Sequence, residues 1–310
     1  MSTESTDVSE SSLDSPAAAP AALAPTRPLY WSIRRELWEN RSIYVGPLIA
    51  AGVVLFGFIV HAAVTLPRRI GNLPALDPAR QEAVLGAPYG FAASMVIVAG
   101  YLVAAFYCLD ALHGERRDRS ILFWKSLPVS DLTIVLSKAS IPYLVVPVIA
   151  LAVALATQLV ILLVSTIVLV ASGVGAGALW TRLPWFQMPL VMLYGLAVHV
   201  LWHAPLFAWL LLVSAWARRT PLLWAVLPLA LGVLEKIAFQ SGHFFSFVRY
   251  RLIGAMGLAF NVDAGKQPIL WLGQLDPLRL LGSGGLWTGL VAAALLLAAA
   301  ARLRRYREPI

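Results

Sequence analysis

Two histidines, His199 and His203, have the spacing at which imidazoles on one helix can share a metal ion. They are four residues apart in the sequence HVLWH, so a helix would place both rings on the same face. The zinc-protease pattern needs a glutamate directly after the first histidine, and Val200 stands there. The chain has five histidines and no second cluster of ligands. We expect hydrogen bonds between helices or a pathway lining, with a membrane-embedded metalloenzyme as the alternative.

Other catalytic patterns are missing from the sequence. No G-x-S-x-G nucleophile pattern occurs, and no acidic residue lies near His199 along the chain. No G-x-x-x-x-G-K-[ST] phosphate loop occurs either, so we expect the chain not to hydrolyse ATP by itself. The single cysteine, Cys108, excludes an internal disulfide and a cysteine-based zinc site. The sequence therefore predicts no catalytic residue, no metal and no cofactor in this chain.

The composition is that of a membrane protein. Hydrophobic types make up 59% of the 310 residues and charged types only 13%, with a mean hydropathy of +0.76. Soluble domains carry about 25% charged residues. This balance excludes an ordinary cytosolic enzyme, a disordered protein and a nucleic-acid-binding domain. The net charge is +8, and the Lys and Arg residues lie in short segments beside apolar runs. This placement favours membrane lipid over nucleic acid as the partner.

Six runs have the length of about 20 apolar residues that crosses a bilayer. They cover roughly 45–65, 91–110, 141–172, 189–216, 222–240 and 286–301. No run has a mid-span Asp or Glu, so coupling to an ion gradient is not expected. Pro142 and Pro147 predict a kink or a shallow start of the third run. We predict an all-α polytopic membrane protein with six transmembrane helices over 45–301.

The basic residues predict the orientation. With both termini in the cytoplasm, the inner segments hold 15 Lys and Arg in 58 residues, and the outer segments hold 9 in 92. This skew favours cytoplasmic termini. The first 28 residues are rich in Ser, Ala, Pro and acids, which predicts a disordered cytoplasmic tail. Residues 302–310 form a basic cytoplasmic tail.

Residues 29–44 predict an interfacial amphipathic helix on the inner leaflet. On a helical wheel one stripe is apolar, made of Leu29, Tyr30, Ile33, Leu37 and Tyr44. The opposite stripe is polar, made of Ser32, Arg35, Glu36, Glu39 and Ser42. Arg34 and Arg41 lie on the apolar side, seven residues apart. We expect both to reach lipid phosphates, with contact to a soluble partner as the alternative.

The segment 113–138, HGERRDRSILFWKSLPVSDLTIVLSK, is the most informative polar stretch. It begins with charges that include Glu115 and Arg116, continues with the apolar block 121–124, and breaks at Leu127–Pro128. Ser130 or Asp131 can then cap a helix that leads into the third span. The apolar block fits two readings. It is a helix with its aromatics in lipid, or a short helix that inserts into a groove of a soluble partner.

These segments together resemble the permease subunits of ATP-binding-cassette (ABC) exporters of the type-2 class. The shared order is RRELWENRSIYVGPL, two spans, and then ERRDRSILFWKSLPVSDLTIVLSK. In that family the stretch after the second span has the form E-R-x-x-x-S/T-h-x-F/L-x-x-S-L-P-h-S/T, with a Lys before the third span. The matching positions are Glu115, Arg116, Ser120, Phe123, Ser126, Leu127, Pro128, Ser130 and Lys138. The resemblance covers about 30–305.

The resemblance implies partners. The family's permease pairs with a second permease copy, as a homodimer or heterodimer, and with two P-loop ATPase subunits that bind ATP and Mg. The segment after the second span would be the coupling helix that docks on the ATPase. Ile121, Phe123 and Trp124 would fill the contact, and Glu115 and Arg116 would lie at its rim.

The resemblance also implies a location and a role. The segment 240–285 would dip into the outer leaflet as a re-entrant or interfacial pair of short helices. We expect a bacterial inner-membrane exporter subunit, and an apolar pathway suggests a lipophilic, peptide-like or drug-like cargo. The alternatives are the metalloenzyme at His199 and His203 and a non-transporting sensor or assembly subunit.

Overall fold

The computed structural model describes residues 28–126, 129–261 and 269–306. Within these ranges the chain is helical and has no strand beyond one isolated bridge between Phe260 and Leu275. Six of the described helices are long and apolar enough to cross a membrane. This confirms the predicted all-α polytopic membrane protein. Of the predicted tail over 1–28, residues 1–27 lie outside the described residues, and Pro28 already begins a helix; the end of the basic tail, 307–310, also lies outside them.

The helices follow one another in a simple order. They are α1 (Pro28–Glu39), α2 (Ser42–Gly71), α3 (Pro78–Ala111), α4 (His113–Arg117), α5 (Ser120–Ser126), α6 (Asp131–Ser140), α7 (Val146–Ala171), α8 (Gly177–Arg182), α9 (Gln187–Trp216), α10 (Pro221–Phe239), α11 (His243–Ala259), α12 (Pro277–Leu281) and α13 (Gly284–Tyr306). Single short turns lie at η1 (Leu73–Ala75), η2 (Ile141–Val145) and η3 (Leu272–Gln274).

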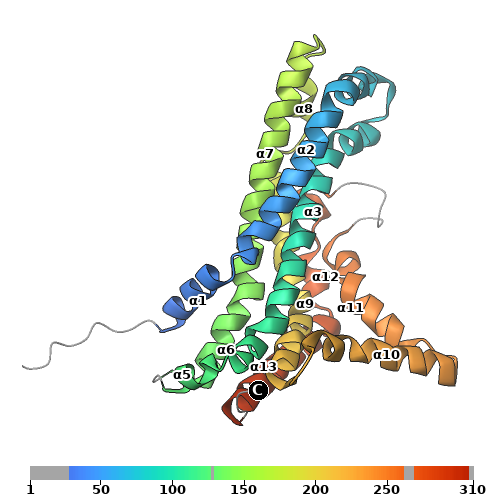
Figure 1. Ribbon diagram of the computed structural model, residues 1–310. Helices are drawn as coiled ribbons and strands as arrows, with labels where there is room; N and C mark the ends of the chain where they lie inside the picture. Colours follow the sequence, from blue (N-terminus) through green and yellow to red (C-terminus); the bar gives the residue numbers. More distant parts are fainter. Residues whose placement is uncertain (1–27, 127–128, 262–268, 307–310) are drawn as a thin grey trace, which may run out of the picture.

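Several helices are longer than a bilayer requires. The 30 residues of α2 and the 34 of α3 give lengths of about 45–50 Å at 1.5 Å per residue, against a hydrocarbon core of about 30 Å. With α7 they form one elongated bundle (Figure 1). We call the end of the bundle that holds α5 and the end of α13 the terminal end, and the opposite end the far end. At the far end, α2, α3, α7 and α8 share an apolar core around Leu66, Leu85 and Leu169.

The third predicted span is interrupted near its start. Ser130 caps α6 by accepting a hydrogen bond from the Thr133 backbone N–H at 3.1 Å, which confirms one of the two predicted caps. The helix then passes through a π turn at Ile141–Val145 before α7. Pro142 lies in this turn and Pro147 follows it, and proline lacks the N–H that an α-helix uses. The predicted irregularity therefore takes the form of a π turn.

The fifth predicted span, α10, makes few contacts with the other described helices. It runs across the direction of α2, α3 and α7 (Figure 1). Gly232 is its one buried residue, and a Cβ there would collide with the Phe244 ring of α11. A ring pair between Trp216 and Trp224, with centroids 4.5 Å apart, joins it to α9. Most of the apolar surface of α10 is therefore left uncovered by the other described residues.

The segment 240–285 contains α11 and α12, and residues 262–268 lie outside the described part. Arg251 fastens α11 to its neighbours. Its guanidinium donates to the Gly285 backbone oxygen at 2.9 Å and lies 4.9 Å from the Trp202 ring. It also occupies the space that a Cβ on Gly289 would need. Entry of this segment into the membrane stays a prediction.

Candidate functional site

The N-terminal segment is two helices rather than one, and one of its polar residues faces inward. α1 ends at Glu39 and α2 begins at Ser42. Glu36, predicted on the water-facing stripe, is only 4% exposed. It accepts hydrogen bonds from the Tyr107 hydroxyl and from Lys138 Nζ, both at 2.8 Å. The helical wheel was wrong here because these partners lie far along the sequence.

The two arginines expected at lipid phosphates lie apart from this buried region. The Arg34 guanidinium rests over the rings of Trp31 and Trp38, at 5.3 and 4.7 Å from their centroids. Arg41 is exposed directly before α2. Their contact with lipid stays a prediction.

Five charged side chains meet at the terminal end, and we call them the buried charge cluster: Glu36, Glu115, Asp131, Lys138 and Arg304. Lys138 Nζ lies 2.8 Å from Glu36 Oε1 and 3.2 Å from Glu115 Oε1. Arg304 pairs with Glu115 Oε2 at 3.1 Å and with Asp131. Four of the side chains are at most 6% exposed, and Asp131 is 27% exposed. The cluster joins α1, α4, α6 and α13.

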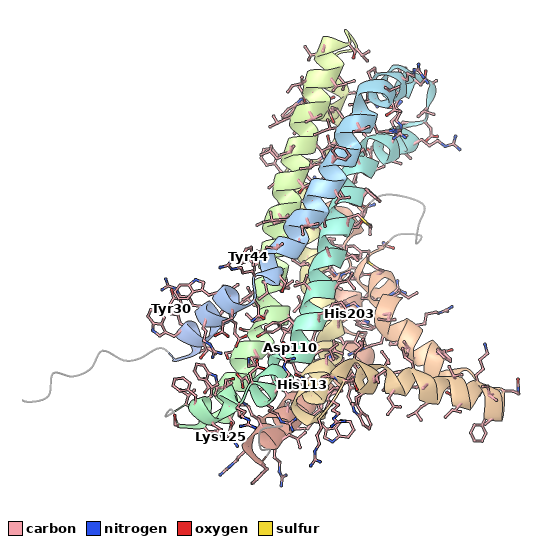
Figure 2. The ribbon with its side chains drawn as sticks, viewed as in Figure 1. Tyr30, Tyr44, Asp110, His113, Lys125 and His203 are labelled. Carbon is pink, nitrogen blue, oxygen red and sulfur yellow. The ribbon has the colours of Figure 1, made fainter. Side chains whose placement is uncertain are left out.

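The helix that follows the second span is also fixed to α9. Arg116 Nη1 donates to the backbone oxygens of Ala215 at 2.9 Å and Ala217 at 3.1 Å. The Ser214 hydroxyl accepts from the backbone N–H of Leu112 and of His113. Figure 2 labels Asp110 and His113 near this junction. α4 is therefore held at the C-terminal end of α9.

The sequence placed Glu115 and Arg116 at the rim of a partner surface, and the structure does not. Both are buried, at 7% and 3% exposure. A buried charge needs a paired charge or hydrogen bonds, and other helices of the same chain supply them. These two residues can position the segment after the second span, but they present no charge to a partner.

The four apolar residues of α5 separate into two groups. Ile121 is buried at 1% exposure, and the Trp124 ring lies beneath the Arg35 guanidinium at 3.8 Å. Leu122 and Phe123 are exposed, at 57% and 60%. We call Leu122 and Phe123 the α5 tip. Lys125 Nζ donates to the Arg305 backbone oxygen at 3.3 Å and ties α5 to α13 (Figure 2).

The remaining residues of the predicted coupling motif have local roles or lie outside the description. The Ser120 hydroxyl donates to the Glu115 backbone oxygen at 3.4 Å, and that of Ser126 to the Phe123 oxygen at 2.7 Å. These bonds support the two short helices from within. Leu127 and Pro128 lie outside the described residues.

The two histidines stack on each other with ring centroids 5.4 Å apart. His199 Nδ1 lies 2.8 Å from the Gly195 backbone oxygen. His203 contacts two carbonyl oxygens, that of His199 through Nδ1 at 2.9 Å and that of Leu252 through Nε2 at 3.1 Å. Both nitrogens of His203 therefore lie against carbonyl oxygens. Among the described residues no group of three His, Cys, Asp or Glu could hold a metal ion.

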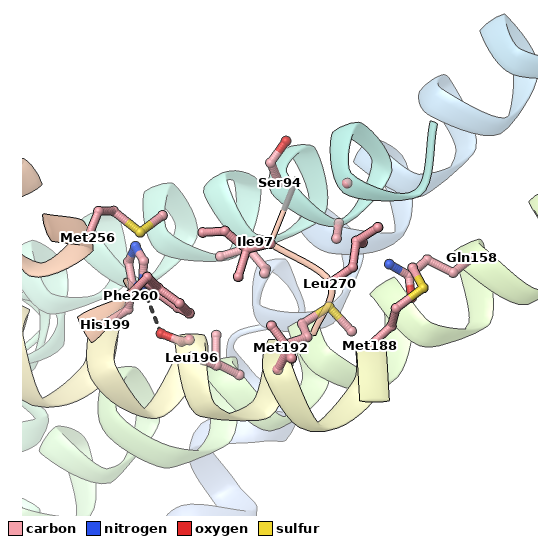
Figure 3. Close-up of a pocket in the computed structure, with 15 residues that line it drawn as sticks. Ser94, Ile97, Gln158, Met188, Met192, Leu196, His199, Met256, Phe260 and Leu270 are labelled. Carbon is pink, nitrogen blue, oxygen red and sulfur yellow. Dashed lines mark hydrogen bonds between the residues drawn. The ribbon is translucent and has the colours of Figure 1, made fainter. Parts of the chain in front are cut away.

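An apolar groove passes beside these histidines. One cavity of about 210 Å³ lies between α3, α9 and α11, with Met188, Met192 and Met256 in its lining (Figure 3). A second cavity of about 360 Å³ adjoins it, since His199 and Ile97 line both. The lining is almost entirely apolar, so the groove suits a lipophilic molecule. We call the two cavities together the histidine groove.

Comparisons with protein-family models, with curated proteins and with solved structures found no match. The function of the buried charge cluster, the α5 tip and the histidine groove must therefore be argued from their geometry.

The sequence reasoning missed that Lys138 and Arg304 complete one cluster. A signal was present for Lys138, because it is a single charge within the apolar stretch TIVLSKASIPYL. A charge in such a run needs a partner. The sequence could not identify that partner as Glu36, which lies 102 residues away.

Proposed function

We propose that this chain is the membrane-spanning permease subunit of an ATP-driven exporter of the type-2 ABC class. The observation that supports this best is the α5 tip. It offers two large apolar side chains on a short helix. The same helix contacts α1 through Trp124 and α13 through Lys125. If a soluble partner displaces such a helix, its contacts can transmit the displacement to the membrane helices.

The surroundings of the α5 tip favour a protein partner over lipid. The helix is preceded by Arg117, Asp118 and Arg119, which are all exposed. An apolar patch with a charged rim is typical of a protein interaction site. Burial of one large aromatic side chain in a partner's pocket can contribute about 2 kcal/mol or more. Two adjacent apolar side chains are therefore enough to make the contact depend on this helix.

The proposal assigns the other parts of the transporter as follows. Separate P-loop ATPase subunits bind ATP and Mg and hydrolyse the nucleotide. A second permease copy completes the pathway, and both termini lie in the cytoplasm of a bacterial inner membrane. The cargo is lipophilic and contacts the histidine groove, whose lining is apolar.

The test is co-purification of the ATPase with variants of the full-length permease. We expect Phe123→Ala, and more strongly Leu122→Ala combined with Phe123→Ala, to release the ATPase while the permease stays folded in the membrane. The matched control is Phe186→Ala, because Phe186 is 92% exposed and directly precedes α9. That variant should retain the ATPase.

Two outcomes would contradict the proposal in different ways. Wild-type ATPase retention and transport in the double variant would mean that α5 is only a lipid-anchored helix. A stable complex with the ATPase that hydrolyses ATP but moves no lipophilic substrate would favour a sensor or assembly subunit.

A further inference from the structure

A second groove lies between α2 and α3 toward the far end, and it combines one cation with apolar walls. Its cavity has a volume of about 240 Å³. His61, Thr65 and Arg69 line it from α2 at intervals of four residues, which places them on one face of that helix. The apolar walls come from both helices: Phe58, Ala62, Leu66, Ala87, Pro88 and Phe91. We call it the α2/α3 groove.

Arg69 is the charged member of this groove and has no carboxylate partner among the described residues. The carboxylates near the far end are already engaged. Asp77 pairs with Arg80 at 3.3 Å, and Glu82 accepts a hydrogen bond from the Trp271 indole at 3.1 Å. Arg69 also borders a small adjoining cavity of about 20 Å³. Within the described part of the chain, the groove therefore presents a positive charge without a paired carboxylate, above an apolar floor.

The depth of the groove matches the level of lipid headgroups. The apolar run of α2 covers about 45–65, so the hydrocarbon ends near Thr65 at the far end. Arg69 is four residues further, about 6 Å along the axis. Its guanidinium therefore falls in the headgroup layer, which is about 5–7 Å thick. Phe58 lies about two turns below Thr65, within the hydrocarbon.

The polar groups of the groove suit a phosphate oxygen. Arg69 can donate two hydrogen bonds to it, and arginine matches phosphate geometry. The Thr65 hydroxyl already donates to the His61 backbone oxygen at 2.8 Å, so it can act only as an acceptor toward a ligand. An anion at this site would thus be held by Arg69.

We propose that the α2/α3 groove binds one anionic phospholipid from the leaflet at the far end. Its phosphate lies against Arg69, and its acyl chains pack on Phe58 and Phe91. An anionic lipid such as phosphatidylglycerol keeps its net negative charge there, whereas the choline of phosphatidylcholine offsets the charge of its phosphate. The site is independent of ATPase binding and of cargo.

The test is native mass spectrometry of the purified full-length chain in a neutral detergent, titrated with phosphatidylglycerol or phosphatidylcholine. We expect one phosphatidylglycerol to bind at least tenfold more tightly than phosphatidylcholine. Arg69→Gln should weaken that lipid about tenfold, and Arg69→Lys should weaken it less. The matched control is Arg68→Gln, because Arg68 is the adjacent exposed arginine and does not line the groove.

A water-soluble headgroup separates a lipid from a free anion. Glycerol 3-phosphate should not displace the bound phosphatidylglycerol, because it lacks the acyl chains. Displacement at low concentration would overturn the proposal in favour of a soluble anion. Equal losses in Arg68→Gln and Arg69→Gln would overturn it in favour of diffuse attraction. Equal affinity for both phospholipids would overturn the charge recognition on which it rests.

Discussion

The replacement of Lys138 by methionine is the most direct test of the buried charge cluster. Methionine has a similar length and fits a buried position, but it carries no charge. In the native chain, Lys138 is the one cation of the cluster that contacts Glu36, at 2.8 Å. Glu115 would keep its pair with Arg304. Glu36 would keep only the Tyr107 hydroxyl and the Asn40 amide. The variant would therefore leave Glu36 as a buried carboxylate without a cation.

The expected loss follows from that change. Removal of one partner from a buried ion pair costs about 3–5 kcal/mol. For a protein of this size each kcal/mol corresponds to about 2 °C in Tm. We expect Lys138→Met to lower Tm by about 6–10 °C by the same relation.

The assay is thermal unfolding in detergent, followed by helical circular dichroism. Lys236→Met is the control, since it makes the same chemical change at an exposed position of α10. The double variant Lys138→Met with Glu36→Gln should recover more than half of the loss, because glutamine is neutral and retains contacts with Tyr107 and Asn40.

Two results would refute this reasoning. A Tm for Lys138→Met within about 1 °C of wild type would mean that water or a rearranged side chain satisfies Glu36. A double variant less stable than Lys138→Met alone would mean that Glu36 gains nothing from losing its charge, so the pair would not be the source of the effect.

Three further predictions address other regions of the chain. His199→Gln with His203→Gln should leave the proposed ATP-driven transport largely intact, since hydrogen bonds between membrane helices average about 0.6 kcal/mol; loss of a stoichiometric metal together with activity would contradict this. Gly289→Ala should displace the Arg251 guanidinium and lower Tm, whereas Gly257→Ala, which has open space around it, should not. A cysteine at position 72 should react with impermeant thiol reagents in intact cells, and one at position 306 should react only with permeant reagents; the reverse pattern would invert the topology.

Much of the fold could be predicted from composition and from the length of the apolar runs. In lipid, a chain must satisfy its backbone hydrogen bonds internally, and a helix does so. Six runs of about 20 apolar residues predict six helices, and the described helices include each of them. The excess length of α2 and α3 was harder to predict. Their far-end residues are moderately apolar, and they form helices because they share a core with α7 and α8. Packing between segments that are distant in the sequence determines how far such helices extend. A local sequence pattern carries no information on that packing.

The candidate site was predicted in outline and misplaced in detail. The segment after the second span was recognised from its apolar block, and α5 lies there. Glu115 was expected at the rim of a partner contact, and Glu36 on a polar helix stripe. Both are buried instead, because Lys138 and Arg304 pair with them from other helices. Helical wheels register only neighbours along the sequence, so they cannot reveal such partners.

The position of the buried charge cluster gives α5 a route into the membrane helices. α4 precedes α5 directly, and Glu115 of α4 pairs with Lys138 of α6. Three residues after Lys138 the chain enters the π turn Ile141–Val145, which separates α6 from α7. A π turn is a common site of altered helix geometry at functional positions. If a partner displaces α5, the ion pairs move α6 with it, and the π turn is where that motion can become a change in the direction of α7. Weakened ion pairs should therefore reduce coupling even where the α5 tip still binds its partner.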